Sequence, residues 1–297
     1  MKQNLAIIIF ATVLAVSLQS YGQEEVEVNK SNIQTYTPSK LLDKGQWDIK
    51  FFNSIYTQTK STGANTSTSS PIVKGRENFF TSTIEFFTGI SENSRINIGA
   101  IIEFRSNTFG GQSAFSVFNF DNSNESRNGF SSIAPSLKIQ PFENVSNFSF
   151  QTALHIPLLK KGDDADQTKV FLDQSAWSFQ NRFFYDYTFP SGDWQLFTEL
   201  NTEYGFGDDK SFANNTFLLA PGVFMSYFPS DKSTILGFVQ HSQRVGDFEQ
   251  NNTSLGFGGK LQLTETLNIE ALYSGIVRGY NFQGLGDSFS IGLRALF

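Results

Sequence analysis

The sequence contains no cysteine, and only 2 of its 297 residues are histidine. The absence of cysteine excludes disulfide bonds, thiolate metal sites and a lipid anchor attached through cysteine. His155 and His241 lie far apart, and neither has a companion at the spacing of a metal site. The acidic run at Asp163, Asp164 and Asp166 lacks the alternate-residue order of a calcium loop. We therefore interpret this run as a solvated loop and expect no metal and no cofactor.

Long hydrophobic runs and basic clusters are also missing. After the N-terminal segment, no stretch approaches the roughly 18 continuous apolar residues of a helix that spans a membrane. Charged residues make up 17% of the chain, and the net charge is −6 without any basic patch. Nucleic acid is therefore not an expected partner, because its phosphates require clustered lysine and arginine.

The N-terminal segment has the features of an export signal. A single lysine precedes an apolar run over residues 5–18, and the small residues Ser20 and Gly22 stand where a signal peptidase reads them. A buried helix or a membrane anchor is the alternative, but the run is short for a spanning helix. We predict a signal peptide over residues 1–22 and a flexible periplasmic leader over residues 23–44. A small plug formed by this leader is an open alternative.

Residues 287–297 alternate between apolar and polar side chains. Phe289 and Ile291 fall on one face, whereas Ser290 and Gly292 fall on the other. Because successive side chains of a strand point to opposite faces, this pattern predicts a strand with one apolar face. Its length suits a tilted strand that crosses a bilayer.

The same alternation recurs along residues 45–297 and predicts about twelve strands. Short turns follow every second strand, and the other connections are longer, including residues 59–77, 106–128 and 160–174. The alternation is blurred near residues 216–228 and 234–245, where apolar residues occupy both faces. Membrane barrels combine short periplasmic turns, longer outside loops and an even strand number. We therefore predict an all-β fold, a transmembrane antiparallel up-and-down β-barrel with both termini in the periplasm.

A soluble exported sandwich or a lipocalin-like barrel would show similar alternation, because it also buries one face of each strand. The predicted strands are longer than the usual five or six residues. The 33 phenylalanines also enrich the apolar faces. Trp47 and Trp194 mark one end of the predicted barrel and Trp177 the other, as aromatic girdles do. We therefore favour the membrane barrel.

The C-terminal strand, with its final Phe297, resembles the terminal strand of Gram-negative outer-membrane β-barrels. This resemblance implies that the barrel-assembly machinery reads the strand, with Phe297 as its signal, and that outer-membrane lipid surrounds the protein. Over residues 46–297 the pattern is similar to that of uncharacterised transporter-like or porin-like barrels. The resemblance rests on the pattern of strands, so it carries over no function for any single residue.

Catalysis is not predicted. Outer-membrane phospholipases carry a histidine and a serine two residues apart on one strand, facing the same way. Here Ser242 directly follows His241, so its hydroxyl points to the opposite face. His155 is followed by isoleucine and proline. Because a nucleophile needs its base within hydrogen-bonding reach, we predict that the protein is not an enzyme.

Charges of both signs occupy the polar faces of the predicted strands. Alternation directs them toward the lumen: Asp48, Lys50, Glu85, Arg95, Glu103, Arg105, Lys138, Arg182, Asp186, Glu199, Glu203, Lys260, Glu270, Arg278 and Arg294. A barrel of about eight strands is filled by its side chains, whereas one of roughly sixteen holds an open pore. An intermediate barrel therefore predicts a narrow polar channel for passive transport of small solutes. The alternative is a closed structural or adhesive barrel that acts through its extracellular loops, and a barrel lipid hydrolase is less favoured.

Overall fold

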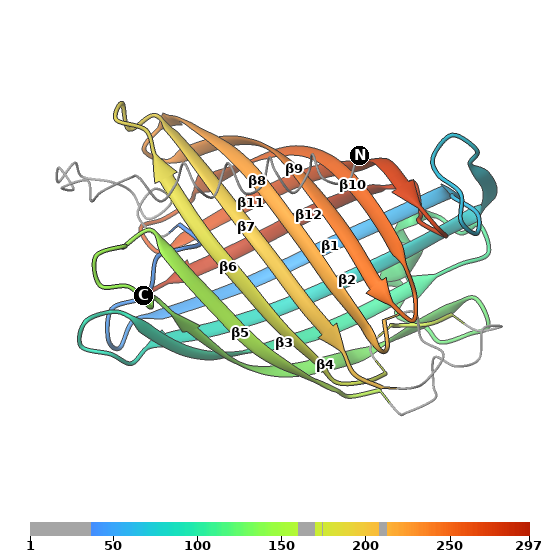
Figure 1. The fold of residues 1–297 in the computed structure, drawn as a ribbon, viewed down its shortest axis with the longest axis horizontal. Helices are drawn as coiled ribbons and strands as arrows, with labels where there is room; N and C mark the ends of the chain where they lie inside the picture. The colour runs from blue at the N-terminus through green and yellow to red at the C-terminus, as the bar shows by residue number, and fades with distance from the viewer. Residues whose placement is uncertain (1–36, 160–169, 174, 208–212) are drawn as a thin grey trace.

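The computed structural model describes residues 37–159, 170–173, 175–207 and 213–297. Within these residues, twelve antiparallel strands close into one barrel, and each strand pairs with its neighbours in sequence (Figure 1). The strands are β1 (Trp47–Ser61), β2 (Ile72–Gly89), β3 (Ile96–Thr108), β4 (Ser126–Ile139), β5 (Phe148–Pro157), β6 (Ser178–Thr188), β7 (Trp194–Gly205), β8 (Thr216–Ser230), β9 (Ser233–Gly246), β10 (Gln250–Gln262), β11 (Leu267–Tyr280) and β12 (Asp287–Leu296). This arrangement confirms the predicted up-and-down barrel.

Closure joins the first strand to the last. β1 pairs with β12 from Asp48 opposite Leu296 to Thr57 opposite Asp287. The main chains of Trp47 and Phe297 extend this ladder, with N–O distances of 2.6 and 3.0 Å. The start of the barrel and its C-terminal residue therefore lie at the same end.

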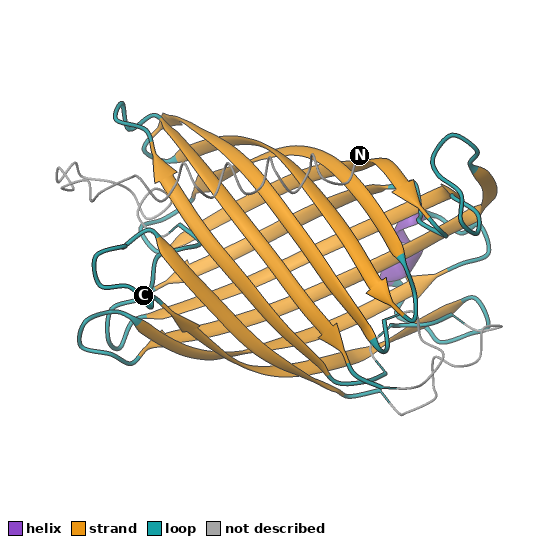
Figure 2. Ribbon diagram, viewed as in Figure 1, coloured by secondary structure: helices purple, strands orange, loops and turns teal. Residues whose placement is uncertain are grey.

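The two ends of the barrel differ in their connections. Short turns lie at the end that carries the C-terminus, and longer connections lie at the other end, together with the 3-10 helix η1 (Ala114–Phe118) (Figures 1 and 2). β1 ends at Ser61 and β2 begins at Ile72. The loop between them therefore spans residues 62–71 and is shorter than the predicted loop 59–77. The loop is shorter because β1 and β2 remain hydrogen-bonded to each other beyond the residues whose side chains alternate clearly. No helix in the described part of the chain is long and apolar enough to cross a membrane.

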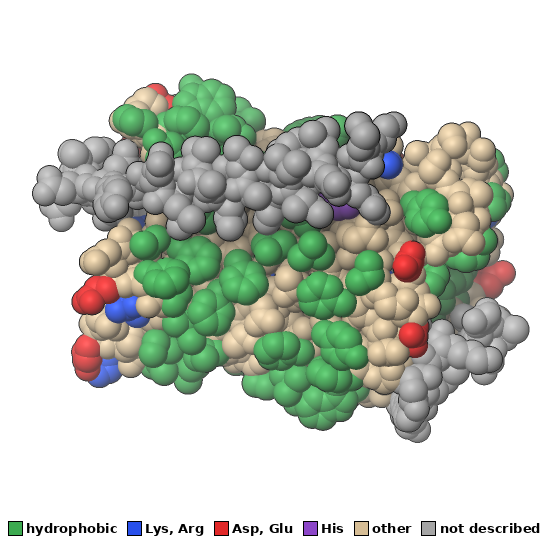
Figure 3. All heavy atoms as spheres, in the orientation of Figure 1, with side chains coloured by type: hydrophobic (Ala, Val, Ile, Leu, Met, Phe, Trp, Pro, Cys, Tyr) green, Lys and Arg blue, Asp and Glu red, His purple; other side chains and the backbone are tan. Residues whose placement is uncertain are grey.

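Apolar side chains cover the outside of the strands, and charged side chains gather at the two ends in the view of Figure 3. Phe257 is 63% exposed and Ile291 is 56% exposed, although both lie in the middle of long strands. Soluble proteins rarely expose so large an apolar surface. An apolar band flanked by aromatic residues suits the hydrocarbon layer of a bilayer.

The register settles the faces of β8 and β9. Tyr227 pairs with both Trp194 and Ile235, and all three are exposed on the outside. Phe224 and Phe238 pair with each other on the opposite, inner face. Alternation is blurred in these two strands because aromatic residues occupy the lumen side as well.

One additional residue in β11 changes the direction of the side chains that follow it. The inward-facing Ser254 pairs with Ile276, whereas the outward-facing Thr253 pairs with Arg278, so Val277 forms a bulge. Val277 and Arg278 are consequently both exposed. The prediction that Arg278 lines the lumen is therefore wrong, because strict alternation does not hold across a bulge.

Candidate functional site in the barrel lumen

A cavity of about 610 Å³ lies inside the barrel and is lined by inward-facing side chains of strands from both halves of the chain. The predicted lumen residues that line it are Lys50, Glu85, Lys138, Arg182, Glu199, Lys260, Glu270 and Arg294. Asp48 and Asp186 are buried beside it. Barrel closure thus brings together charges that are up to 246 residues apart in sequence, as Asp48 and Arg294 are.

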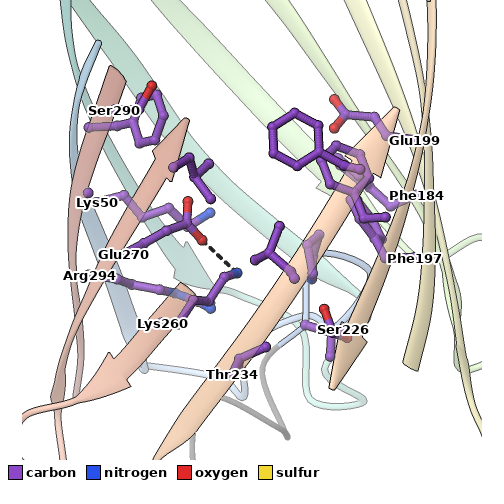
Figure 4. Close-up of a pocket in the computed structure, with 18 of the residues that line it drawn as sticks. Lys50, Phe184, Phe197, Glu199, Ser226, Thr234, Lys260, Glu270, Ser290 and Arg294 are labelled. Atoms are coloured by element: carbon purple, nitrogen blue, oxygen red, sulfur yellow. Dashed lines mark ion pairs between the residues drawn. The ribbon is translucent and has the colours of Figure 1, made fainter. Parts of the chain in front are cut away.

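Ion pairs organise one wall of the cavity. Arg294 donates two hydrogen bonds of 2.8 Å to the Asp48 carboxylate, across the closure between β12 and β1. Lys50 Nζ lies 3.6 Å from Asp48 and 3.5 Å from Glu85. Next to this network, Lys260 pairs with Glu270 at 2.9 Å (Figure 4). This charged wall comprises Asp48, Lys50, Glu85, Lys260, Glu270 and Arg294.

A row of aromatic side chains forms the opposite wall. Phe184, Phe197, Phe224 and Phe238 lie on the neighbouring strands β6 to β9 and face inward. Successive ring centroids are 6.2, 5.1 and 5.2 Å apart. Figure 4 shows Phe184 and Phe197 across the cavity from Lys50, Glu270 and Lys260. We refer to these four rings as the aromatic wall.

Sequence reasoning missed the aromatic wall because it assigned phenylalanine to the lipid face. The signal was present on β7, where Phe197 stands between Gln195 and Glu199 on the polar face. A ring in phase with polar residues indicates an aromatic surface inside the barrel.

The periplasmic end of the cavity is formed by the last residues of the predicted leader. The hydroxyls of Thr37 and Ser39 donate hydrogen bonds to the Asp186 carboxylate. Lys138 Nζ donates to the carbonyl oxygens of Pro38 and Lys40, at 2.5 and 3.0 Å. Residues 37–40 therefore lie against the inner wall of the barrel, whereas residues 23–36 lie outside the described residues.

Apolar packing continues this attachment toward β1. Leu42 is buried in a cluster with Phe87 and Leu296, and its main-chain N–H donates to Asn97 Oδ1 at 3.2 Å. Residues 37–42 thus occupy the periplasmic mouth of the barrel before the chain turns into the first strand.

At the extracellular end, residues 170–173 of the β5–β6 connection lie in the lumen. Arg105 donates one hydrogen bond to Glu103 at 2.7 Å and another to the carbonyl of Leu172 at 2.5 Å. Asn107 Nδ2 donates to the carbonyl of Phe171 at 2.6 Å. Leu172 is fully buried. These contacts narrow the lumen with an apolar segment held by polar side chains of β3.

Phe171 extends this constriction to other strands. Its ring centroid lies 6.1 Å from that of Phe79 and 5.3 Å from that of Phe109. The ring of Tyr56 contacts Phe79 in turn, at 5.8 Å. An aromatic cluster therefore narrows the lumen between the cavity and the extracellular side.

Two predicted lumen residues that do not line the cavity, Glu203 and Arg95, lie in different parts of the barrel. Glu203 faces inward on β7, opposite Gln180. Arg95 precedes β3 and donates to the carbonyls of Gln140 and Pro141, at 3.1 and 2.8 Å. The prediction that Arg95 lines the lumen is wrong, because the side chain instead binds the β4–β5 turn at the periplasmic rim.

The structure also places one histidine near a serine. His155 Nδ1 and Ser132 Oγ lie 3.3 Å apart on adjacent strands inside the barrel. Ser132 is only 1% exposed, so its hydroxyl is closed to a substrate. Among the described residues no group of three or more metal-ligating side chains could hold a metal ion, and residues 163–166 lie outside the described residues.

Comparison with known proteins identifies the fold. No family model matches the sequence, and a search of curated proteins found no match. The chain is similar to the solved COG4313 outer membrane channel from Pseudomonas putida F1, with a TM-score of 0.68 and 8% identity, over 88% of this chain and 99% of that one. The chain has the fold of an outer-membrane β-barrel.

This outer-membrane barrel fold is shared by proteins with different roles. The β domain of the Bordetella autotransporter BrkA is also similar, with a TM-score of 0.54 and 11% identity, over 84% of this chain and 99% of that one. One neighbour is a channel and the other is part of an autotransporter. A function for the present barrel must therefore be argued from its own lumen.

Proposed function

We propose that the protein is an outer-membrane channel that passes small solutes by passive diffusion. The observation that carries this proposal is the cavity of about 610 Å³, which has one charged wall and one aromatic wall, inside a barrel with an apolar exterior. A polar lining lets water and solutes enter an interior that lipid cannot reach. The similar Pseudomonas barrel is itself an outer-membrane channel, which supports the proposal.

Two segments of the chain that lie inside the lumen favour a narrow channel. Residues 37–42 occupy the periplasmic mouth, and residues 170–173 narrow the extracellular side. The same two segments favour the second candidate, a closed structural or adhesive barrel that acts through its extracellular loops. The two candidates differ in whether solutes cross the cavity.

Conductance separates these candidates. The refolded protein would be inserted into a planar bilayer, and its folded state would be checked by heat-modifiable migration on gels. A channel gives discrete, reproducible current steps, and the reversal potential in a salt gradient gives its charge preference. A silent bilayer with correctly folded protein would contradict the channel and favour the closed barrel.

We also propose that residues 1–22 direct export and that the assembly machinery recognises β12 with its final Phe297. The assembled barrel would then contact outer-membrane lipid. The exposed Phe297 side chain and its main-chain pairing with Trp47 support this proposal. Phe297→Ala should lower the amount of heat-modifiable barrel in the outer-membrane fraction several-fold. Leu263→Ala, also at the exposed periplasmic end, is the matched control and should leave that amount unchanged.

A further inference from the structure

We infer that the cavity binds and passes small aromatic carboxylates. This inference rests on the proposed channel function and specifies its substrate class. Three features of the cavity carry it: the aromatic wall, the exposure of the opposing cations, and the short distance between a ring and two cationic groups.

The aromatic wall offers a continuous surface to a flat ring. Phe184, Phe197, Phe224 and Phe238 have successive centroids 5.1–6.2 Å apart, which is within the range of favourable ring contacts. Phe197 and Phe224 both line the cavity. An entering aromatic ring can therefore exchange one ring neighbour for the next as it moves along the wall.

The charged wall presents cations rather than acids to the cavity. Lys50 has 36% of its side chain exposed, whereas its partners Asp48 and Glu85 have 8% and 16%. Lys260 is likewise more exposed than its partner Glu270, with exposed side-chain fractions of 32% and 22%. In each of these ion pairs the cationic side chain is therefore the more exposed partner, although Glu85 and Glu270 also line the cavity. This wall thus offers more cationic than anionic surface to a solute, and charge-assisted hydrogen bonds to these cations would favour a carboxylate.

Cations also lie beside the aromatic wall. Arg182 Cζ is 5.1 Å and Lys138 Nζ is 5.3 Å from the centroid of Phe184. Arg182 also pairs with Glu199 at 2.8 Å, and it is the more exposed partner, at 28% against 13%. A molecule whose carboxylate is attached directly to its ring can therefore place the ring on Phe197 while its carboxylate approaches Arg182. The volume of about 610 Å³ lies within the roughly 300–1,000 Å³ of small-molecule sites.

Benzoate is the probe, and its chemical components serve as comparisons. Acetate carries the carboxylate without the ring, benzyl alcohol carries the ring without the charge, and benzylammonium reverses the charge. Each would be added to the conducting protein in a planar bilayer, and its binding to detergent-solubilised protein would be measured by calorimetry. We expect benzoate to block the ion current and to bind about tenfold more tightly than any of the other three.

Substitutions in each wall test which part of the cavity binds the ring of benzoate and which part binds its carboxylate. Phe197→Leu should lower the affinity for benzoate about tenfold and leave the affinity for acetate unchanged. Arg182→Gln and Lys260→Gln should each lower the affinity for both anions. Phe130→Leu, on the exposed outer face, and Lys232→Gln, at a periplasmic turn, are the matched controls. Both controls should retain the affinity of the unsubstituted protein.

The outcomes separate the inference from the channel itself. If the protein conducts and benzoate and acetate block the current equally, the inference is overturned and the proposed channel function still holds. Benzoate binding in calorimetry with a silent bilayer would overturn the channel and support the site. Preference for benzylammonium over benzoate would overturn the assignment of a carboxylate.

Discussion

At the scale of single residues, the pair of Asp48 and Arg294 joins the first and last strands. Its two bonds of 2.8 Å are charge-assisted and largely shielded within the lumen. Asp48→Asn should therefore destabilise the barrel by about 1–3 kcal/mol, because Arg294 loses its charged acceptor. Urea unfolding followed by tryptophan fluorescence measures the change.

The matched control for that substitution is Glu92→Gln. Glu92 pairs with Lys44 at the periplasmic rim, where both side chains are more than half exposed. Exposed ion pairs contribute roughly 0–1 kcal/mol, so this variant should unfold almost as the original protein does. Equal losses for both variants would show that the lumen pair does not contribute more than a surface pair.

A glycine makes room for one ring of the aromatic wall. A Cβ at Gly256 would lie 2.2 Å from Phe238 Cζ and 2.6 Å from the carbonyl oxygen of Tyr273. Gly256→Ala should displace Phe238 and cost about 1–3 kcal/mol of unfolding free energy. Gly237→Ala is the control, because its nearest neighbour would be 3.9 Å away. A comparison of urea midpoints checks both, and a stable Gly256→Ala variant would contradict the steric reading.

At the scale of elements, residues 37–40 are held in the lumen by side chains on β4 and β6. Removing the hydroxyls that bind Asp186, in a Thr37→Ala, Ser39→Ala double variant, should release this segment from the wall. We expect the single-channel conductance to rise, since the periplasmic mouth becomes wider. Ser191→Ala in the β6–β7 turn is the control, and an unchanged conductance in the double variant would show that residues 37–42 do not limit the current.

Element boundaries show how far the sequence determines the fold. The alternation in β12 and the short periplasmic turns are local features, so they predicted the strands and the topology. The faces of β8 and β9 required the register, because Phe224 and Phe238 are as apolar as the residues that face outward. The bulge at Val277 gives no local signal, and it reversed the predicted direction of Arg278.

At the scale of the whole molecule, the exterior is adapted to lipid. Ile291 is 56% exposed in the middle of β12. Ile291→Arg should reduce the free energy of folding into vesicles by about 2–4 kcal/mol, because a guanidinium in hydrocarbon is poorly solvated. Equilibrium folding into vesicles in urea measures this, with Ile291→Leu as the control. A neutral effect of arginine would show that this face does not contact hydrocarbon.

The lumen was predictable only in part at this scale. Alternation identified the charges that line the cavity, such as Lys260 and Glu270, because it records which face each residue occupies. It does not record what enters the barrel from outside the strands. Residues 37–42 and 170–173 have no strand pattern, and their places depend on hydrogen bonds to β3, β4 and β6, which are distant from them in sequence.

Residues 37–42 are tethered to β1, so in the proposed channel they would compete with a solute for the cavity. Thr37 and Pro38 line the space that a solute would occupy, and the chain links them to Trp47 through only a few residues. A short tether holds its end at an effective concentration on the order of millimolar. Dilution does not change that value, so in the proposed channel a solute would have to displace a segment of the barrel's own chain.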